Sequence, residues 1–260
     1  MEKFNLHTHT YRCHHAKGED EEYVIAAIEN GYKTMGFSDH APYIFPKELN
    51  YYSDFRMEPY RAQDYVDSVR HLQEKYKDQI DIKLGFEVEW YPQLIDEELK
   101  FLKSFDYDYL ILGQHFTRNE YEKDAIHVMD GTRKESDLDL YISQVLTAAK
   151  SGEFVYVAHP DVLNFKGNKK VYVEKMTEFV KELKKIDIPI EYNFLGFWDH
   201  RNYPNRTFWE IVSQVGNRTV MGLDAHQPWI YADTVNIDNM RNEIHSLGLN
   251  LIEDVNEILK

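Results

Sequence analysis

The sequence has 260 residues, of which 43% are hydrophobic and 29% charged, and its net charge is −15 at pH 7. This is the composition of a globular protein, and it excludes wholesale disorder. The excess of acidic residues argues against nucleic acids and anionic membranes as partners, because both are bound by clusters of basic residues. A small anionic substrate is compatible with this charge if bound metal ions supply positive charge locally.

The chain contains one cysteine, Cys13, which excludes an internal disulfide framework. The first ten residues lack the apolar segment of a secretory signal, and no run of about 18 apolar residues predicts a membrane span. No low-complexity or linker-like segment divides the chain. We therefore expect a cytoplasmic protein with a single domain that spans residues 1–260.

Short apolar runs alternate with amphipathic segments along the chain. The apolar runs predict seven strands, at residues 3–7, 34–38, 81–88, 109–113, 155–158, 188–193 and 219–223. The amphipathic segments predict seven helices, at about residues 20–30, 59–77, 93–103, 135–151, 170–186, 205–215 and 236–247. This alternation predicts a parallel sheet, and seven such units in one domain of this length favour a closed α/β barrel. No glycine-rich phosphate loop follows a strand, which argues against a dinucleotide-binding fold.

Two long connections interrupt the regular alternation. Residues 41–58 are rich in aromatic and turn-forming residues, and residues 114–134 follow the fourth predicted strand. Both connections begin where a strand ends. Because the carboxyl ends of the strands carry the active site in α/β barrels, we expect these two loops to shape a substrate pocket.

Histidines and carboxylates are concentrated where the predicted strands end. A lone histidine after a strand most often packs or caps, and we assign such a role to His71, His127, His200 and His245. Repetition on six of seven strands makes coincidence implausible, and imidazole together with carboxylate suits zinc, manganese or iron. One tetrahedral site takes three or four ligands, so this set predicts two or three divalent ions. The polar residues at the strand ends are His7, His9, His14, His15, Asp39, His40, Glu87, Glu89, His115, His159, Asp161, Glu191, Asn193, Asp224 and His226.

Two triplets repeat the same geometry at opposite ends of the chain. In His7-Thr8-His9 the two imidazoles lie two residues apart, so on a strand both can reach one ion. Asp224-Ala225-His226 has the same spacing after the seventh strand. The first and seventh strands become neighbours when a seven-stranded barrel closes, so we expect the two triplets to meet.

At these motifs the sequence resembles the PHP (polymerase and histidinol phosphatase) metallophosphoesterases, and it is most similar to their bacterial histidinol-phosphatase branch. The matching segments are NLHTHTYRCHHA (5–16), GFSDHAP (36–42), GFEVEW (85–90), DYLILGQHF (108–116), VAHPD (157–161) and GLDAHQP (222–228). The resemblance implies a distorted seven-stranded (β/α)7 barrel with its active site at the carboxyl ends of the strands. It also implies hydrolysis of phosphate monoesters at a cluster of three divalent ions.

Carried over by position, the resemblance implies three metal sites, two of which share Glu87 as a bridging carboxylate. The spacing in this family selects His15 rather than its neighbour His14 as a ligand. The implied ligands are His7, His9, Glu87 and Asp224 for one ion, Glu87, His115 and His159 for the second, and His15, His40 and His226 for the third.

The resemblance implies hydrolysis of L-histidinol phosphate to L-histidinol and phosphate, a step of histidine biosynthesis. We expect a hydroxide held between the ions that Glu87 bridges to attack phosphorus, with Asp224 completing this centre. His226, Asp161 or a metal-bound water would protonate the leaving alkoxide. The sequence favours none of these three proton donors over the others.

Charged residues beyond the metal ligands are expected to bind the substrate. Arginine pairs with phosphate through two parallel hydrogen bonds. Arg201, in the loop after the sixth strand, is our first choice, and Arg206 and Arg118 are the alternatives. Glu89 is expected either to orient a ligand or to face the substrate. The acceptor for a substrate amine would be Glu89, Asp161 or Asp199.

Four other functions share some of these sequence features. A phosphatase acting on another small monoester is compatible with the same motifs, because Phe194, Phe197 and Trp198 stand where small residues are more usual in the histidinol-phosphatase branch. An amidohydrolase-like deacylase is disfavoured, since the segment YLILG contains no lysine. The acidic charge and the absence of a polymerase segment disfavour a proofreading nuclease. A non-catalytic metal-binding regulator is less expected, since all nine ligand positions are present. The sequence leaves the oligomeric state and the physiological metal open.

Overall fold

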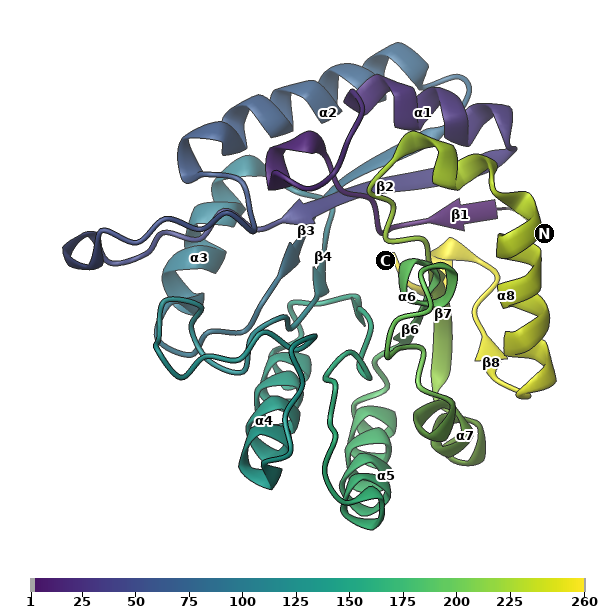
Figure 1. The fold of residues 1–260 in the computed structure, drawn as a ribbon. Coiled ribbons are helices and arrows are strands. Elements are labelled where there is room, and N and C mark those ends of the chain that lie inside the picture. Colours follow the sequence, from purple (N-terminus) through teal and green to yellow (C-terminus); the bar gives the residue numbers. More distant parts are fainter. Residues whose placement is uncertain (1–2, 260) are drawn as a thin grey trace.

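The computed structural model describes residues 3–259, in which eight parallel strands form one curved sheet in the order of the chain. Figure 1 shows the helices around the outside of this sheet. The strands are β1 (Lys3–Asn5), β2 (Tyr32–His40), β3 (Asp81–Val88), β4 (Tyr109–Leu112), β5 (Tyr156–Val157), β6 (Ile190–Asn193), β7 (Arg218–Gly222) and β8 (Asn250–Leu251). The helices are α1 (Asp20–Glu29), α2 (Ala62–Tyr76), α3 (Ile95–Leu102), α4 (Glu135–Ser151), α5 (Lys169–Ile186), α6 (Phe194–Trp198), α7 (Arg206–Val215) and α8 (Thr234–Ser246).

The predicted (β/α) barrel is confirmed, with two elements that the sequence did not predict. The eighth strand has two residues, which is too short for an alternating pattern to reveal. Helix α6 begins directly after β6, where the side chain of Asn193 accepts a hydrogen bond from the backbone N–H of Gly196 at 3.0 Å. An asparagine cap after a strand starts this helix without a loop, so no turn separates the two elements.

The barrel closes through the carboxyl-terminal continuation of β7. The first residues of β7 pair with β8, whereas Ala225, beyond the end of β7, bridges to Thr8. The backbone of Ala225 accepts a hydrogen bond from His9 at 2.9 Å and donates one to His7 at 3.1 Å. The two polar triplets therefore meet, as their position on the first and seventh strands predicts.

Two apolar layers hold the strands in place, because successive side chains of a strand point to opposite faces. On β4, Leu110 and Leu112 belong to the large cluster that packs with the helices. Tyr109 and Ile111 belong to a smaller cluster with Leu6 and with residues of β5 and β7, on the opposite face of β4. This second cluster shares its face of the sheet with the polar residues that end the strands.

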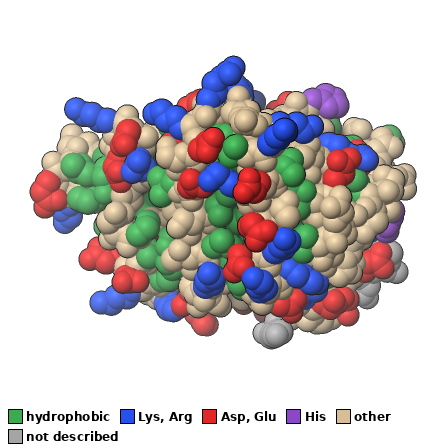
Figure 2. Space-filling view, turned by 90° about the horizontal axis from the view of Figure 1, so that it is seen from below, with side chains coloured by type: hydrophobic (Ala, Val, Ile, Leu, Met, Phe, Trp, Pro, Cys, Tyr) green, Lys and Arg blue, Asp and Glu red, His purple; other side chains and the backbone are tan. Residues whose placement is uncertain are grey.

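The surface carries charges of both signs. Figure 2 shows acidic and basic side chains intermixed on the face seen from below. Among residues 3–259, no helix has the length and apolar character that a membrane crossing requires.

Helix α3 carries a carboxyl group into the core. Glu98 is 1% exposed, and burial raises its pKa from 4.5 to about 8, although Arg56 acts in the opposite direction. The folded state therefore keeps a proton that the unfolded state loses above pH 4.5. Protonated Glu98 makes its full contribution to the free energy of unfolding below pH 4.5. This contribution is lost as the pH rises from 4.5 to about 8, the pKa of Glu98 in the folded state.

We predict that Glu98→Gln removes this part of the pH dependence, because glutamine stays neutral at every pH. The free energy of unfolding of the wild type should fall, relative to that of the variant, by about 1.4 kcal/mol per pH unit across this window. Urea unfolding at several pH values measures the difference. Glu97→Gln, one residue away on the exposed face of α3, should behave as the wild type. Parallel profiles for wild type and Glu98→Gln would contradict the prediction.

Candidate metal centre

The structure brings all nine sequence-predicted ligands together at the carboxyl ends of the strands. Several groups of three donor atoms lie within 4.8 Å of one another, the spacing that one ion needs. Two of these groups contain Glu87, and a third joins His7, His9 and Asp224. The triplets of the first and seventh strands supply this third group, so barrel closure is what assembles it.

The carboxylate of Glu87 lies among five imidazole rings and has no solvent exposure. Its Oε1 lies 2.9 Å from Nε2 of His159, and its Oε2 lies 3.0 Å from Nδ1 of His40. Neither oxygen has a hydrogen-bond partner among the described residues. The other imidazoles with a nitrogen within 3.6 Å of this carboxylate are those of His7, His9 and His115.

Buried polar atoms without hydrogen bonds require another partner. Here, carboxylate oxygens and imidazole nitrogens face one another, which is the arrangement of ligands around a shared cation. The end of β4 leaves room for the carboxylate of Glu87, since a Cβ atom on Gly113 would lie 1.9 Å from its Oε1. The donor set therefore fits divalent metal ions.

The group of His7, His9 and Asp224 is equally compact. Oδ1 of Asp224 lies 3.1 Å from Nε2 of His9 and 3.5 Å from Nε2 of His7, and the two Nε2 atoms are 3.1 Å apart. Asn193 steadies the carboxylate by donating a hydrogen bond to Oδ2 at 3.1 Å. Three donor atoms thus converge from the first and last parts of the barrel.

A further group, formed by His15, His40 and His226, settles which of two adjacent histidines faces the cluster. The ring of His15 lies 4.9 Å from that of His226 and 5.3 Å from that of His40, between ring centres. His14 has a φ of +70° and points toward Tyr52 instead, with 3.4 Å between its Nε2 and the phenol oxygen. His15 is therefore the one placed to bind, as the family spacing predicts.

Oxygen atoms behind the imidazoles fix their orientation. In each case Nδ1 faces the outer oxygen, which leaves Nε2 directed at the cluster. A Cβ atom on Gly222 would lie 1.6 Å from Oε1 of Glu191, so only glycine admits this carboxylate. The pairs are His7 with Glu191 at 2.7 Å, His115 with Glu89 at 2.8 Å, His9 with Asp39 at 3.3 Å and His15 with the carbonyl of Cys13 at 2.7 Å.

The electrostatics of the cluster favour positive charge. Burial by itself would lower the pKa of His7, but the carboxylates of Glu191, Asp224 and Glu87 raise it to about 10. Burial would raise the pKa of Glu87, but the surrounding imidazoles hold it well below its usual range. The carboxylates thus stay ionised, and protons and metal ions compete for the imidazole nitrogens.

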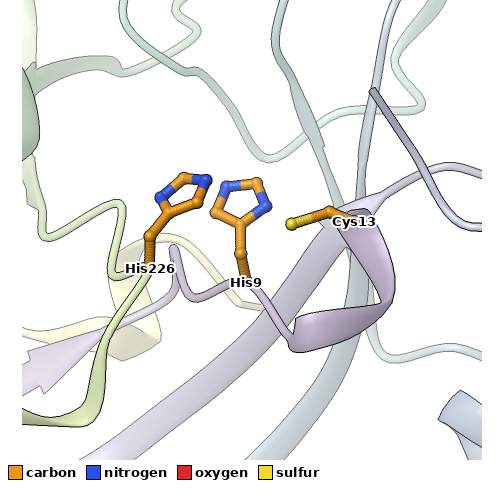
Figure 3. Close-up of side chains that lie close together, drawn as sticks. All are labelled: His9, Cys13 and His226. Atoms are coloured by element: carbon orange, nitrogen blue, oxygen red, sulfur yellow. The ribbon is translucent and has the colours of Figure 1, made fainter. Parts of the chain in front are cut away.

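Cys13 lies at the edge of the cluster. Figure 3 shows the ring of His9 between Cys13 and His226, and these three residues form a further group spaced for one ion. Nε2 of His9 already faces Asp224, and its Nδ1 faces Asp39. Burial raises the pKa of the Cys13 thiol, which keeps it protonated. We therefore interpret Cys13 as packing behind His9 rather than as a metal ligand.

A cavity of about 380 Å³ opens beside the cluster, and both predicted loops contribute to its wall. His127, which we expected to pack or cap, lines it, and burial lowers the pKa of this histidine to about 4, so the ring is neutral. Phe55 and Tyr203 were missed, because a single aromatic residue in a loop carries no signal of its own. The lining residues are His15, His40, Phe55, His115, His127, Met129, Val162, Leu195, Trp198, Asp199, Arg201, Tyr203, Asp224, His226 and Gln227.

Of the three arginines considered for phosphate binding, only Arg201 lines this cavity. Its Nη1 donates a hydrogen bond to the hydroxyl of Tyr203 at 3.3 Å. Arg206 and Arg118, the alternatives, lie outside the lining of the cavity and are paired with carboxylates. Arg206 begins α7 on its outer face and pairs with Glu210 at 2.8 Å, and Arg118 pairs with Asp124 at 3.0 Å.

Two carboxylates considered for the substrate, Asp161 and Glu89, are buried and engaged by other residues. Oδ2 of Asp161 accepts hydrogen bonds from the backbone N–H of Asn205 at 2.5 Å and from Nε1 of Trp209 at 2.9 Å. It thereby fixes the start of α7. Glu89 has no solvent exposure and faces Arg56 and His115. It orients a predicted ligand, which was the other role expected of it.

The comparisons with known proteins agree with this geometry. A family model described as PHP domain matches residues 5–194. The chain belongs to the PHP domain family. This confirms the resemblance that the sequence motifs indicate.

Relatives of this PHP domain protein include two that are named probable histidinol-phosphatase. The protein from Deinococcus radiodurans is 27% identical over 240 residues, which cover 85% of each chain. The protein from Schizosaccharomyces pombe is 24% identical over 248 residues, which cover 85% of this chain and 80% of the relative.

A solved structure shares the fold of this PHP domain. It is that of histidinol phosphate phosphatase from Lactococcus lactis, in complex with zinc, L-histidinol and phosphate. It matches with a TM-score of 0.73 and 20% sequence identity, covering 96% of this chain and 95% of the other. At this identity the match establishes the common barrel.

A buried arginine ties both loops of this PHP domain to the metal cluster. Arg56 is 1% exposed, and its Nη1 donates hydrogen bonds to Oε2 of Glu89 at 2.7 Å and to the carbonyl of Ala41 at 3.0 Å. Its Nε donates to Oε1 of Glu120, in the second loop, at 2.8 Å. Through Glu89 this network reaches His115. The sequence did not indicate it, since an arginine in a polar loop gives no sign of burial.

We predict that Arg56→Gln destabilises the protein by about 3–5 kcal/mol, because it leaves two buried carboxylates without their cation. Urea unfolding measures the free energy of unfolding. Arg206→Gln is the matched control, since it breaks an exposed arginine–glutamate pair of the same 2.8 Å length and should leave the unfolding midpoint unchanged. Equal effects of the two substitutions would show that the buried network does not stabilise the fold.

Proposed function

We propose that this PHP domain protein is a metal-dependent phosphate monoester hydrolase that converts L-histidinol phosphate to L-histidinol and phosphate. The observation that carries the proposal is the buried carboxylate of Glu87, with five imidazoles around it, two of which line the cavity beside Arg201. The names of the relatives that match most of the chain support the substrate. The enzyme would act in histidine biosynthesis, in the cytoplasm, as a single domain of residues 1–260.

The cofactors proposed are two to three divalent ions, with zinc, manganese and iron as candidates. When bound, such ions lower the pKa of water and neutralise charge on the phosphoryl group. Glu87 would be shared by two ions, since its two oxygens face different imidazoles. The residues that would hold the ions are His7, His9, His15, His40, Glu87, His115, His159, Asp224 and His226.

The chain's own residues would position the substrate. Arg201, held by Tyr203, would pair with the phosphoryl oxygens beside Asp224. Of the two side chains considered for protonating the leaving alkoxide, His226 lines the cavity, whereas Asp161 is engaged by Asn205 and Trp209.

A second candidate is a PHP phosphatase that acts on another small monoester. The observation that favours it is Trp198, which lines the cavity where small residues are more usual in the histidinol-phosphatase branch. A substrate panel separates the two candidates, because both share the same chemistry at phosphorus.

We predict that the purified protein contains between two and three divalent ions per chain and loses phosphatase activity on treatment with a chelator. Reloading with Zn²⁺, Mn²⁺ or Fe²⁺ should restore activity, with L-histidinol phosphate preferred over other monoesters. Elemental analysis and a phosphatase panel provide the measurements. One ion or none after gentle purification would speak against the trinuclear centre. Activity without a preference for L-histidinol phosphate would favour the second candidate.

We predict that Glu87→Gln lowers kcat by more than about a thousandfold, since the substitution removes the charge that two ions would share. His71→Ala and His245→Ala are matched controls, because both histidines are exposed on helices, α2 and α8. Both should retain nearly full kcat/KM on L-histidinol phosphate. If all three variants lost activity equally, the placement of the metal centre would be wrong.

A further inference from the structure

The cavity contains few charged side chains besides the proposed metal ligands. Among the lining residues that the structure describes, Asp199 and Arg201 alone are charged once the proposed ligands and the neutral ring of His127 are set aside. They carry opposite charges. A substrate with a phosphate and an ammonium group would meet one partner for each.

The other carboxylates considered for an amine are already engaged. Glu89 is fully buried against Arg56 and His115, and Asp161 accepts hydrogen bonds from α7. Neither lines the cavity. Asp224 faces His7 and His9 at the proposed metal centre. By elimination, Asp199 is the carboxylate that a cationic part of the substrate can reach.

Asp199 and Arg201 form an ion pair that borders the cavity. Oδ2 of Asp199 accepts a hydrogen bond from Nε of Arg201 at 2.9 Å, and their side chains are 50% and 30% exposed. His200, between them, has a φ of +51°, and the backbone N–H of Arg201 donates to the carbonyl of Gly196 at 3.0 Å. This turn holds both charged side chains beside one cavity. Such a half-exposed pair is weak, so substrate groups can replace either partner.

An indole adjoins this pair. Trp198 precedes Asp199, lines the cavity and is 38% exposed. It packs edge-on against Trp229, with 5.2 Å between ring centres, and Nε1 of Trp229 donates to Gln227 at 2.8 Å. The face of an indole attracts a cation. Trp198 and Asp199 thus offer an ammonium group both a carboxylate and an aromatic surface.

We propose that Asp199 binds the ammonium group of the substrate and thereby selects amine-bearing phosphate esters. The inference rests on the proposed phosphatase function, because it assumes that phosphate pairs with Arg201. The substrate amine then takes the place of Arg201 at Asp199. An ester without an amine leaves Asp199 unpaired beside a phosphate dianion, and this repulsion disfavours it.

The test compares L-histidinol phosphate with its analogue that has hydrogen in place of the amine. The measured quantity is kcat/KM for L-histidinol phosphate divided by kcat/KM for the amine-free ester. In Asp199→Asn this ratio should fall by about tenfold or more. Glu210→Gln is the matched control. It breaks a pair with Arg206 of 2.8 Å, and Glu210 is 50% exposed, as Asp199 is, but lies outside the cavity. The control should keep the wild-type ratio, and an unchanged ratio in Asp199→Asn overturns the proposal.

A binding measurement separates this inference from the proposed function. Titration calorimetry of zinc-loaded protein with L-histidinol and with its amine-free analogue, both in inorganic phosphate, requires no turnover. The wild type should bind L-histidinol more tightly, and Asp199→Asn should remove the difference. If no ester is hydrolysed but this pattern appears, the phosphatase function fails and the amine site stands. If hydrolysis is efficient but both proteins bind the two alcohols equally, the function stands and the inference fails.

Discussion

The buried carboxylate of Glu87 is the constraint on which the centre of this molecule depends. It has no solvent exposure and no hydrogen bond within residues 3–259, yet imidazole nitrogens lie as close as 2.9 Å. A buried anion is strongly destabilising unless positive charge compensates it. Protons on the imidazoles or bound cations can supply that charge. The convergence of nitrogen and oxygen atoms on shared points favours cations, which explains why so many ligands surround one acid.

Barrel closure and small residues make this arrangement possible. The first residues of β7 pair with β8, and the residues just beyond the end of β7 pair with the segment that follows β1. The contact with the chain after β1 closes the barrel at its carboxyl end, where His7 and Asp224 meet. Gly113 and Gly222 leave space for the carboxylates of Glu87 and Glu191, because a Cβ atom at either position would clash with them. The polar end of the barrel is therefore built from backbone geometry as much as from the ligands.

The carboxylates behind the imidazoles connect the site to the rest of the fold. Glu89 orients His115 and is itself held by Arg56, which also holds Glu120 in the second long loop. Buried ion pairs seldom add stability compared with apolar packing, because desolvation offsets their attraction. Their presence here is accounted for by geometry, since they keep two loops and a ring nitrogen in fixed positions beside the cavity.

The sequence by itself determined the barrel and the polar residues at its strand ends, because strand periodicity is a local pattern that repeats along the chain. His7, Glu87 and Asp224 could be placed from strand ends alone. Tertiary structure decided the roles of the remaining charged residues. Glu89 and Asp161 look like any acid after a strand, and only packing shows that arginine or α7 engages them. Burial and partners depend on segments distant in sequence, and no local pattern encodes them.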